Sequence, residues 1–259
     1  WHLLLGLHKL GAIGVPATHM LTEHDLEYRF ERASIRLVLT VPDAALEKAI
    51  DVAAAKTAGP PILKMRLHGA KAGWLDFAAE MAAADGRWSR PTGAAATQNA
   101  DTMLIYFSSG TTGQPKMVVH DFTYPLGHIV TATFWQNVRD GGLHYTVADT
   151  GWAKSMWGKL YGQWIAGSAV FVHDYDKFSA TKTLDVCAKY GVTTFCAPPT
   201  VYRFLIKEDL SKYDFSRLEY AVVAGEPLNP EVFEQFRKAT GLKLMEAYGQ
   251  TEMTVGVGN

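Results

Sequence analysis

Cysteine is scarce in this chain of 259 residues, and neither sign of charge is in excess. Two cysteines, Cys187 and Cys196, are too few for a disulfide scaffold or a cysteine-based metal site, and they fit a reducing compartment. The 25 lysines and arginines nearly cancel the 26 aspartates and glutamates, so no overall positive field is present to hold a phosphate backbone. We therefore expect a cytoplasmic protein with no nucleic-acid partner.

Long hydrophobic runs are also missing. The most apolar stretch, residues 1–20, is interrupted by His2, His8, Lys9 and Pro16, and no run reaches the roughly 18 residues that span a bilayer. The same stretch lacks the charged start and the small-residue cleavage site of a signal peptide. We expect no membrane span.

What is present is the composition of an ordinary globular chain, with 48% hydrophobic and 20% charged residues and a mean hydropathy of −0.03. The chain starts at Trp1 instead of methionine, and residues 254–259 show no terminating element. We expect it to be a piece of a longer chain.

Short apolar, β-branched runs alternate with segments of helical period, which predicts an α/β fold with mostly parallel sheets flanked by helices. Residues 85–101 are polar and aperiodic, which predicts a surface loop. The expected strands are 12–15, 35–41, 102–107, 117–120, 143–148, 169–172, 192–196, 220–224 and 242–247. The first expected helix ends at Gly11, and the second begins at a capping box of Thr22 and Asp25. The other expected helices are 46–58, 123–134, 153–165, 180–190, 200–209 and 229–241.

Two of these helices carry predicted inward faces. In the first, Thr123 is the expected N-cap, and the inward side chains are Leu126, Ile129, Val130 and Phe134. In the second, one continuous stripe is expected to face the core: Ala153, Met156, Trp157, Leu160, Tyr161, Trp164 and Ile165.

Polar and glycine-rich turns follow four predicted strands. They begin at Ser108, Asp149, Gly225 and Tyr248. Because ligands of open parallel sheets bind outside the carboxyl ends of the strands, we expect these turns to share one sheet edge and to form one site.

The first turn suits a polyphosphate, because hydroxyl groups and accessible backbone N–H groups are followed by one positive charge. It is no Walker A loop, since Lys116 follows Gly113 by three residues and leads into a strand. The competing interpretation is a flexible surface linker, which rarely lies tightly between two buried strands. The candidate residues are Ser108, Ser109, Gly110, Thr111, Thr112, Gly113, Gln114, Pro115 and Lys116.

The last turn supplies further nucleotide contacts. The Thr251 hydroxyl is placed to reach an α-phosphate, and the Glu252 carboxylate suits Mg²⁺ held together with substrate phosphates. Tyr248 offers an aromatic face to a purine and Glu246 an acceptor to its exocyclic amine. Taken alone, this segment also fits a strand followed by a tight turn.

Together these residues match a known family. The segments Tyr-Phe-Ser-Ser-Gly-Thr-Thr-Gly-Gln-Pro-Lys (106–116) and Tyr-Gly-Gln-Thr-Glu (248–252) resemble the phosphate-loop and adenylate signatures of the adenylate-forming superfamily. Residues 149–152, 198–203 and 224–228 resemble the branch of medium-chain acyl-CoA synthetases. The resemblance covers essentially the whole chain, more weakly over the first hundred residues.

The resemblance implies a role for each candidate residue. Residues 108–116 would bind the β- and γ-phosphates, Glu252 would hold Mg²⁺, and Trp152 would line the acyl pocket. Thr251, Glu252 and Lys116 would serve catalysis, and Thr251 would also contact the substrate. The adenine and α-phosphate contacts would be Gly225, Glu226, Pro227, Glu246, Ala247, Tyr248, Gly249, Gln250 and Thr251.

The implied reaction joins ATP to a carboxylic acid, of the fatty or short- to medium-chain acyl type, forming an acyl-adenylate and pyrophosphate. Coenzyme A then displaces AMP after a C-terminal lid domain swings into place. Residues 1–259 would be an incomplete N-terminal AMP-binding domain, with an N-terminal βα part (1–100), an ATP- and acyl-binding part (101–259) and no lid. We expect such a fragment not to run the full reaction at a normal rate.

Two alternatives remain open. One is an amino-acid or aryl-acid adenylation domain, and the other is a nucleotide-binding fragment without turnover. A wholly apolar pocket around Trp152 would favour an acyl-CoA synthetase, whereas a buried charge there would favour the amino-acid or aryl-acid alternative. The nine histidines show no paired ligand spacing, so we expect structural or surface roles for them.

Overall fold

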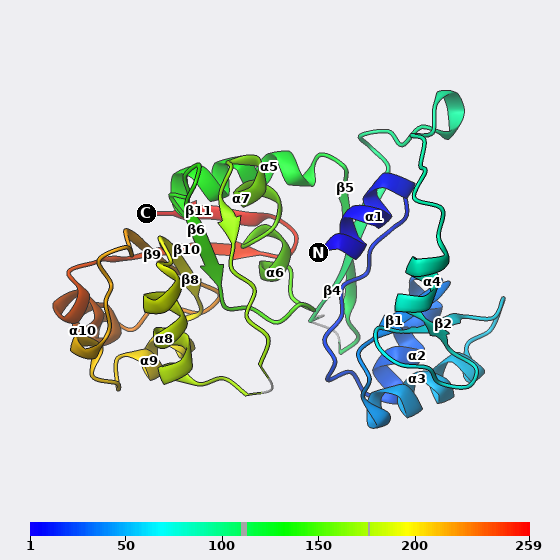
Figure 1. Ribbon diagram of the computed structural model, residues 1–259, viewed down its shortest axis with the longest axis horizontal. Helices are drawn as coiled ribbons and strands as arrows, with labels where there is room; N and C mark the ends of the chain where they lie inside the picture. Colours follow the sequence, from blue (N-terminus) through cyan, green and yellow to red (C-terminus); the bar gives the residue numbers. More distant parts are fainter. Residues whose placement is uncertain (110–112, 176) are drawn as a thin grey trace. The chain divides into compact units, whose positions relative to one another are not determined.

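The computed structural model describes residues 1–109, 113–175 and 177–259, and the chain divides into two compact units (Figure 1). Unit 1 comprises Trp1–His8, Ala12–Pro16 and Gln98–Asn259, and unit 2 comprises Lys9–Gly11 and Ala17–Thr97. The predicted fold class, α/β with mainly parallel sheets, is confirmed.

The centre of unit 1 is a six-stranded sheet with the order β11-β10-β9-β8-β6-β7. All neighbouring strands are parallel except β10 and β11, so the carboxyl ends of β6, β8, β9 and β10 meet at one edge. The strands are β6 (Leu143–Thr146), β7 (Ala169–Val170), β8 (Thr194–Ala197), β9 (Tyr220–Ala224), β10 (Leu244–Gln250) and β11 (Thr254–Gly258).

Alternation along these strands builds a core on each face of the sheet. Phe195 and Val223 pack with one set of helices, whereas Cys196 and Val222 pack with the other. The first set is α8 (Ala180–Tyr190), α9 (Pro199–Leu205) and α10 (Pro230–Thr240), with the short η3 (Leu210–Lys212). The second set is α5 (Tyr124–Val130), η2 (Thr131–Trp135), α6 (Lys154–Trp157) and α7 (Tyr161–Ile165).

Residues next to helix α10 set both of its ends, so the sequence alone predicted where the helix begins and ends. The Asn229 side chain accepts from the Glu231 amide at 2.8 Å, and Pro230 occupies the first turn. Gly241 ends the helix with φ +78°, a left-handed conformation that favours glycine. The predicted boundaries of α8, α10 and β9 are confirmed.

The inward face predicted for α5 and η2 is wrong. Leu126, Val130 and Phe134 are 58%, 61% and 79% exposed, while His128 and Trp135 are buried on the opposite face. An aromatic cluster holds that face inward, and Thr131–Trp135 forms a wider π-helical turn that rotates the following residues. Thr123 is the N-cap residue of α5, as predicted, but its side chain makes no capping hydrogen bond, and its hydroxyl donates instead to Asp121 Oδ1 at 2.5 Å.

The predicted helix 153–165 is two short helices, α6 and α7, separated at Gly158. The Gly158 carbonyl oxygen accepts from His144 Nε2 at 2.8 Å, Thr146 Oγ1 at 2.6 Å and Gln136 Nε2 at 3.1 Å. Three side-chain donors therefore take the carbonyl that a continuous helix would pair with a backbone amide. As a result, Trp164 and Ile165, predicted to be core residues, are 39% and 51% exposed.

Unit 2 holds a small parallel sheet, β1-β2-β3, covered by helices. The predicted capping box of Thr22 and Asp25 is confirmed at the start of α2. Residues 63–66 and 75–83 form elements that the sequence pattern did not reveal. The elements are β1 (Leu37–Thr40), β2 (Leu63–Arg66), β3 (Leu75–Asp76), α2 (Glu23–Arg32), α3 (Ala44–Lys56), α4 (Phe77–Ala83) and η1 (Gly93–Ala95).

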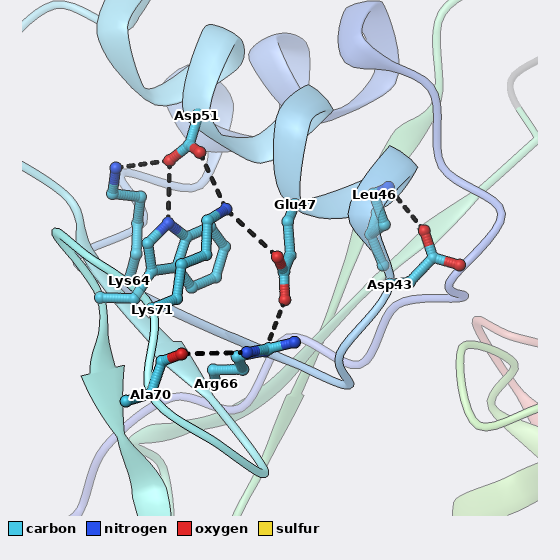
Figure 2. Close-up of polar contacts among 9 residues, drawn as sticks. Asp43, Leu46, Glu47, Asp51, Lys64, Arg66, Ala70 and Lys71 are labelled. Carbon is cyan, nitrogen blue, oxygen red and sulfur yellow. Dashed lines mark hydrogen bonds and ion pairs between the residues drawn. The ribbon is translucent and has the colours of Figure 1, made fainter.

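Figure 2 shows a network of ion pairs that joins α3 to the segment around β2. The Glu47 side chain, 7% exposed, lies 2.7 Å from Arg66 Nε and 3.2 Å from Lys71 Nζ. Lys71 also reaches Asp51 at 3.0 Å, and Lys64 reaches the same carboxylate at 2.5 Å. Because Glu47 is buried, its pairing matters more to stability than that of a surface carboxylate.

Candidate functional site

The predicted phosphate-binding segment links the two strands of a β-hairpin, β4 (Thr102–Ser108) and β5 (Lys116–Asp121). The two strands are antiparallel, with Ser108 opposite Lys116, and they form a sheet of their own. The expectation that four turns share one sheet edge is therefore wrong for this segment. Ser109, Gly113, Gln114 and Lys116 are exposed, Ser108 and Pro115 are half-buried, and Gly110, Thr111 and Thr112 lie outside the described residues.

The hairpin nevertheless meets the turn that follows β10. Ser108 Oγ donates to Glu252 Oε1 at 3.4 Å, and His120 Nε2 lies 2.8 Å from the carbonyl oxygen of Thr251. A carbonyl oxygen only accepts, so His120 donates through Nε2. Burial lowers the pKa of His120, and the neutral imidazole suits this hydrogen bond.

The segment 248–252 is the end of β10 followed by a turn. Tyr248 is 60% exposed, which leaves its ring open to a ligand, whereas Ala247 is buried beside Ala224 of β9. The pairing of β10 with β11 shifts register after Tyr248. A Cβ at Gly249 would lie 1.7 Å from the Thr254 carbonyl oxygen, so only glycine fits at this shift.

Two glutamates near this edge are already engaged by the protein. Glu226, in the turn after β9, accepts from Thr200 Oγ1 at 2.7 Å and forms an ion pair with Arg203 at 3.1 Å. Glu246 accepts through Oε1 from the Leu228 amide at 2.9 Å. Glu246 therefore fixes the turn after β9 against β10, a role that the sequence did not reveal.

The turn after β6 contributes an exposed ring and a lysine. Asp149 Oδ1 accepts from the Gly151 amide at 2.7 Å and shapes the turn, and the Trp152 side chain is 68% exposed. Lys154 Nζ donates to the carbonyl oxygen of Ala224, joining this turn to the one after β9. Sequence analysis missed Lys154, although a charged residue two positions after Trp152 was the available signal.

Other kinds of site are not apparent near these turns. Within the described ranges, no group of three His, Cys, Asp or Glu side chains is arranged to hold a metal ion. A surface pocket of about 560 Å³ is lined by side chains between Glu234 and Lys243, and one of about 390 Å³ by side chains between Ile206 and Ser211 together with Gln235, Lys238 and Ala239; none of these residues belongs to the turns above. Every helix in the described part of the chain is too short or too polar to cross a membrane.

The profile of the AMP-binding enzyme family matches residues 2–259. The chain belongs to this family. Among curated members, it is 37% identical to mouse acyl-coenzyme A synthetase ACSM3, mitochondrial, over 97% of this chain and 42% of that protein. It is 34% identical to mouse ACSM5, over the whole of this chain and 44% of that protein. The chain thus spans less than half the length of these relatives.

Solved structures of AMP-binding enzymes share the fold. An acyl-CoA synthetase from Brucella canis matches 99% of this chain and 46% of its own, with a TM-score of 0.86 and 27% identity. ATP-bound MatB from Rhodopseudomonas palustris matches 99% of this chain and 48% of its own, with a TM-score of 0.81 and 20% identity. At that identity, the second match shows the fold alone.

Proposed function

We propose that residues 1–259 are an incomplete N-terminal domain of an AMP-forming acyl-CoA synthetase, in which residues 101–259 bind ATP and a carboxylic acid. The observation that carries the proposal is the contact of the β4–β5 hairpin with the turn after β10, through Ser108–Glu252 and His120–Thr251. The family match and the 34–37% identity to acyl-coenzyme A synthetases support the same function.

The proposed nucleotide position follows from the chemistry of these segments. Residues 108–116, ending in Lys116, bind the β- and γ-phosphates, and Thr251 binds the α-phosphate. The exposed ring of Tyr248 stacks on adenine, and the turn of residues 225–227 borders it. Pyrophosphate leaves as the acid attacks the α-phosphate, a reaction that needs positioning and charge neutralisation more than a protein nucleophile.

The residues present fit a magnesium ion that arrives with ATP. Glu252 is exposed and contacts the Ser108 hydroxyl, and one carboxylate with several phosphate oxygens is a common way to bind Mg²⁺. Glu252 would hold the ion, which would neutralise charge on the phosphates.

The proposed acid site lies at Trp152, and coenzyme A is the proposed acceptor of the acyl group. Because residues 1–259 span less than half the length of these relatives, we expect these residues alone to bind ATP while exchanging pyrophosphate slowly. The cytoplasmic location stays a prediction, and the curated relatives carry the description mitochondrial.

Calorimetric titration of the chain with ATP and Mg²⁺ tests this proposal. We expect saturable binding, weakened about tenfold or more by Glu252→Gln only when Mg²⁺ is present. Glu234→Gln, which alters an exposed ion pair with Arg237, is the matched control and should bind as the parent chain does. An absence of ATP binding by the folded chain would remove the proposal.

A second candidate has one observation in its favour. A partly buried charge, Lys154, lies two residues from Trp152, and such a charge favours an amino-acid or aryl-acid substrate over a plain fatty acid. ATP–pyrophosphate exchange with panels of fatty, aryl and amino acids distinguishes the two. Tight ATP binding with no exchange for any acid would instead indicate a nucleotide-binding fragment without turnover.

A further inference from the structure

Lys154 carries an ammonium group that lacks a carboxylate partner. Its Nζ donates to the Ala224 carbonyl oxygen, and among the described residues no carboxylate oxygen lies within 4.0 Å of it. An ammonium group has three donors, so two N–H groups remain for another acceptor. Leaving a largely desolvated charge in this state is costly, which makes the position unusual for a purely structural lysine.

Glu226, in the turn after β9, does not supply the missing partner. Burial lowers the pKa of Lys154 from its ordinary value, and the charge of Glu226 acts in the opposite direction. The Glu226 carboxylate is held by Thr200 and Arg203. The chain therefore keeps a positive charge beside a carboxylate that is already neutralised by another cation.

The backbone of Gly225 lies against the Lys154 side chain. Gly225 has φ +110° and no side chain, and a Cβ built there would lie 3.2 Å from Lys154 Nζ. The ammonium thus lies against bare backbone at the carboxyl edge of β9. Trp152, two residues before it, is exposed at the carboxyl edge of β6.

We propose that the Lys154 ammonium binds a carboxylate group of the acid substrate and is a specificity-determining residue of this site. The inference rests on the proposed function, because it assumes that the acid enters between the turns after β6 and β9. A lysine ammonium is a compact charge that binds a carboxylate without a fixed geometry. The carboxylate is either the one that is activated or a second one at the far end of a dicarboxylic acid.

A purely structural role makes a different prediction. If Lys154 serves only to bind the Ala224 carbonyl, Lys154→Gln should preserve that hydrogen bond and the stability of the chain. Lys154→Met should then lose stability, and neither variant should change the affinity for acids. If the charge binds substrate, both variants should lose acid affinity whatever their melting temperatures.

The test is calorimetric titration of the chain with hexanoate and with adipate, at one ionic strength and with saturating α,β-methylene-ATP and Mg²⁺. The parent chain, Lys154→Met, Lys154→Gln and Lys154→Arg are compared. Lys182→Met, which removes an exposed lysine of α8, controls for the change in net charge. Binding of the nucleotide analogue is measured first in each variant, and thermal unfolding shows that each is folded.

We expect Lys154→Met and Lys154→Gln to weaken acid binding about tenfold or more, since hydrogen bonds to charged groups contribute on that scale. Lys154→Arg should retain most of the affinity. If the neutral variants lose affinity for both acids, Lys154 binds the carboxylate that is activated. If they lose affinity for adipate alone, Lys154 binds the distal carboxylate of a dicarboxylic acid. Unchanged acid affinity in both neutral variants, or no acid binding by the parent chain, overturns the inference. Nucleotide binding in the same samples shows separately whether the proposed function stands.

Discussion

The Nε2 atom of His120 lies 2.8 Å from the carbonyl oxygen of Thr251, across 131 residues of sequence. This hydrogen bond ties β5 of the hairpin to the turn after β10. The His120 ring also packs on Tyr124, with ring centroids 4.2 Å apart. His120 therefore holds two candidate nucleotide-binding segments together without being a proposed ligand itself.

His120→Phe should separate the two segments. The phenyl ring keeps the packing on Tyr124 but donates no hydrogen bond, so we expect a loss of about 1 kcal/mol in the free energy of unfolding and several-fold weaker ATP binding. Urea unfolding and ATP titration measure the two effects. His68→Phe, at an exposed position of unit 2, should change neither. Equal ATP affinity in the parent chain and His120→Phe would show that the contact does not position the site.

Lys159 should destabilise the chain at neutral pH. The residue is 6% exposed, and burial lowers its pKa from 10.5 to about 8, while Asp149 opposes the shift. The unfolded chain therefore holds this proton up to a higher pH than the folded chain does. The charged Lys159 therefore lowers the free energy of unfolding by its full amount below pH 8, and this loss disappears as pH rises toward 10.5. The difference between the two pKa values corresponds to roughly 3 kcal/mol of unfolding free energy.

Lys159→Met should accordingly raise the free energy of unfolding at pH 7 by about 1 to 3 kcal/mol. Its stability should also rise less between pH 8 and 10 than that of the parent chain. Urea unfolding at several pH values measures both effects, and Lys189→Met at the exposed end of α8 is the control. A less stable Lys159→Met at pH 7 would mean that the contacts of this lysine outweigh its burial.

His144 should make the chain sensitive to acid. The imidazole is fully buried between Thr194, Thr146 and the Gly158 carbonyl oxygen, and burial lowers its pKa from 6.5 to about 4. The unfolded chain takes up this proton near pH 6.5, whereas the folded chain does so only near pH 4. Stability from the neutral imidazole is therefore present above pH 6.5 and is lost as pH falls toward 4, by roughly 3 kcal/mol.

The proton resonances of His144 followed between pH 4 and 8 measure this shift directly. His144→Gln should reduce the slope of stability against pH in the same window. The remaining slope should include His128, whose pKa burial lowers to about 3. Titration of the His144 imidazole near pH 6.5 in the folded chain would contradict this account.

Glu47→Ala should destabilise unit 2 by about 3 to 5 kcal/mol. Without the buried Glu47 carboxylate, the positive charges of Arg66 and Lys71 lose an ion-pair partner. Hydrogen exchange of the Ile50 and Ala53 amides in α3 reports on this unit. Asp85→Ala removes an ion pair of which both side chains are exposed and should leave the exchange of these amides unchanged. Similar effects of the two substitutions would show that burial of Glu47 adds nothing.

The sequence predicted elements whose signals are local and failed where distant partners decide. The ends of helix α8, which matches the predicted range 180–190, are set locally, since Ser179 caps the helix and Gly191 ends it. The break at Gly158 was missed because its carbonyl binds donors from 12 to 22 residues earlier in the chain. Strand β11 was missed because two glycines interrupt its β-branched residues, and its partner in the sheet is β10.

The same distinction applies to the candidate site. The family was identified from local spacing. This spacing is that of the hydroxyls, glycines and Lys116 in residues 108–116, and of Thr251 and Glu252. Lys154 was missed and the partner of His120 could not be predicted, because Ala224 and Thr251 lie 70 and 131 residues away from them. Only the folded chain brings these groups together.

The most direct test of the central claim is hydrogen exchange of the chain with and without ATP and Mg²⁺. Our account places one nucleotide between the β4–β5 hairpin and the turn after β10, so it predicts slower exchange in residues 113–121 and 248–253 over the same range of ATP concentration. Protection of one segment without the other, or protection confined to unit 2, would contradict it.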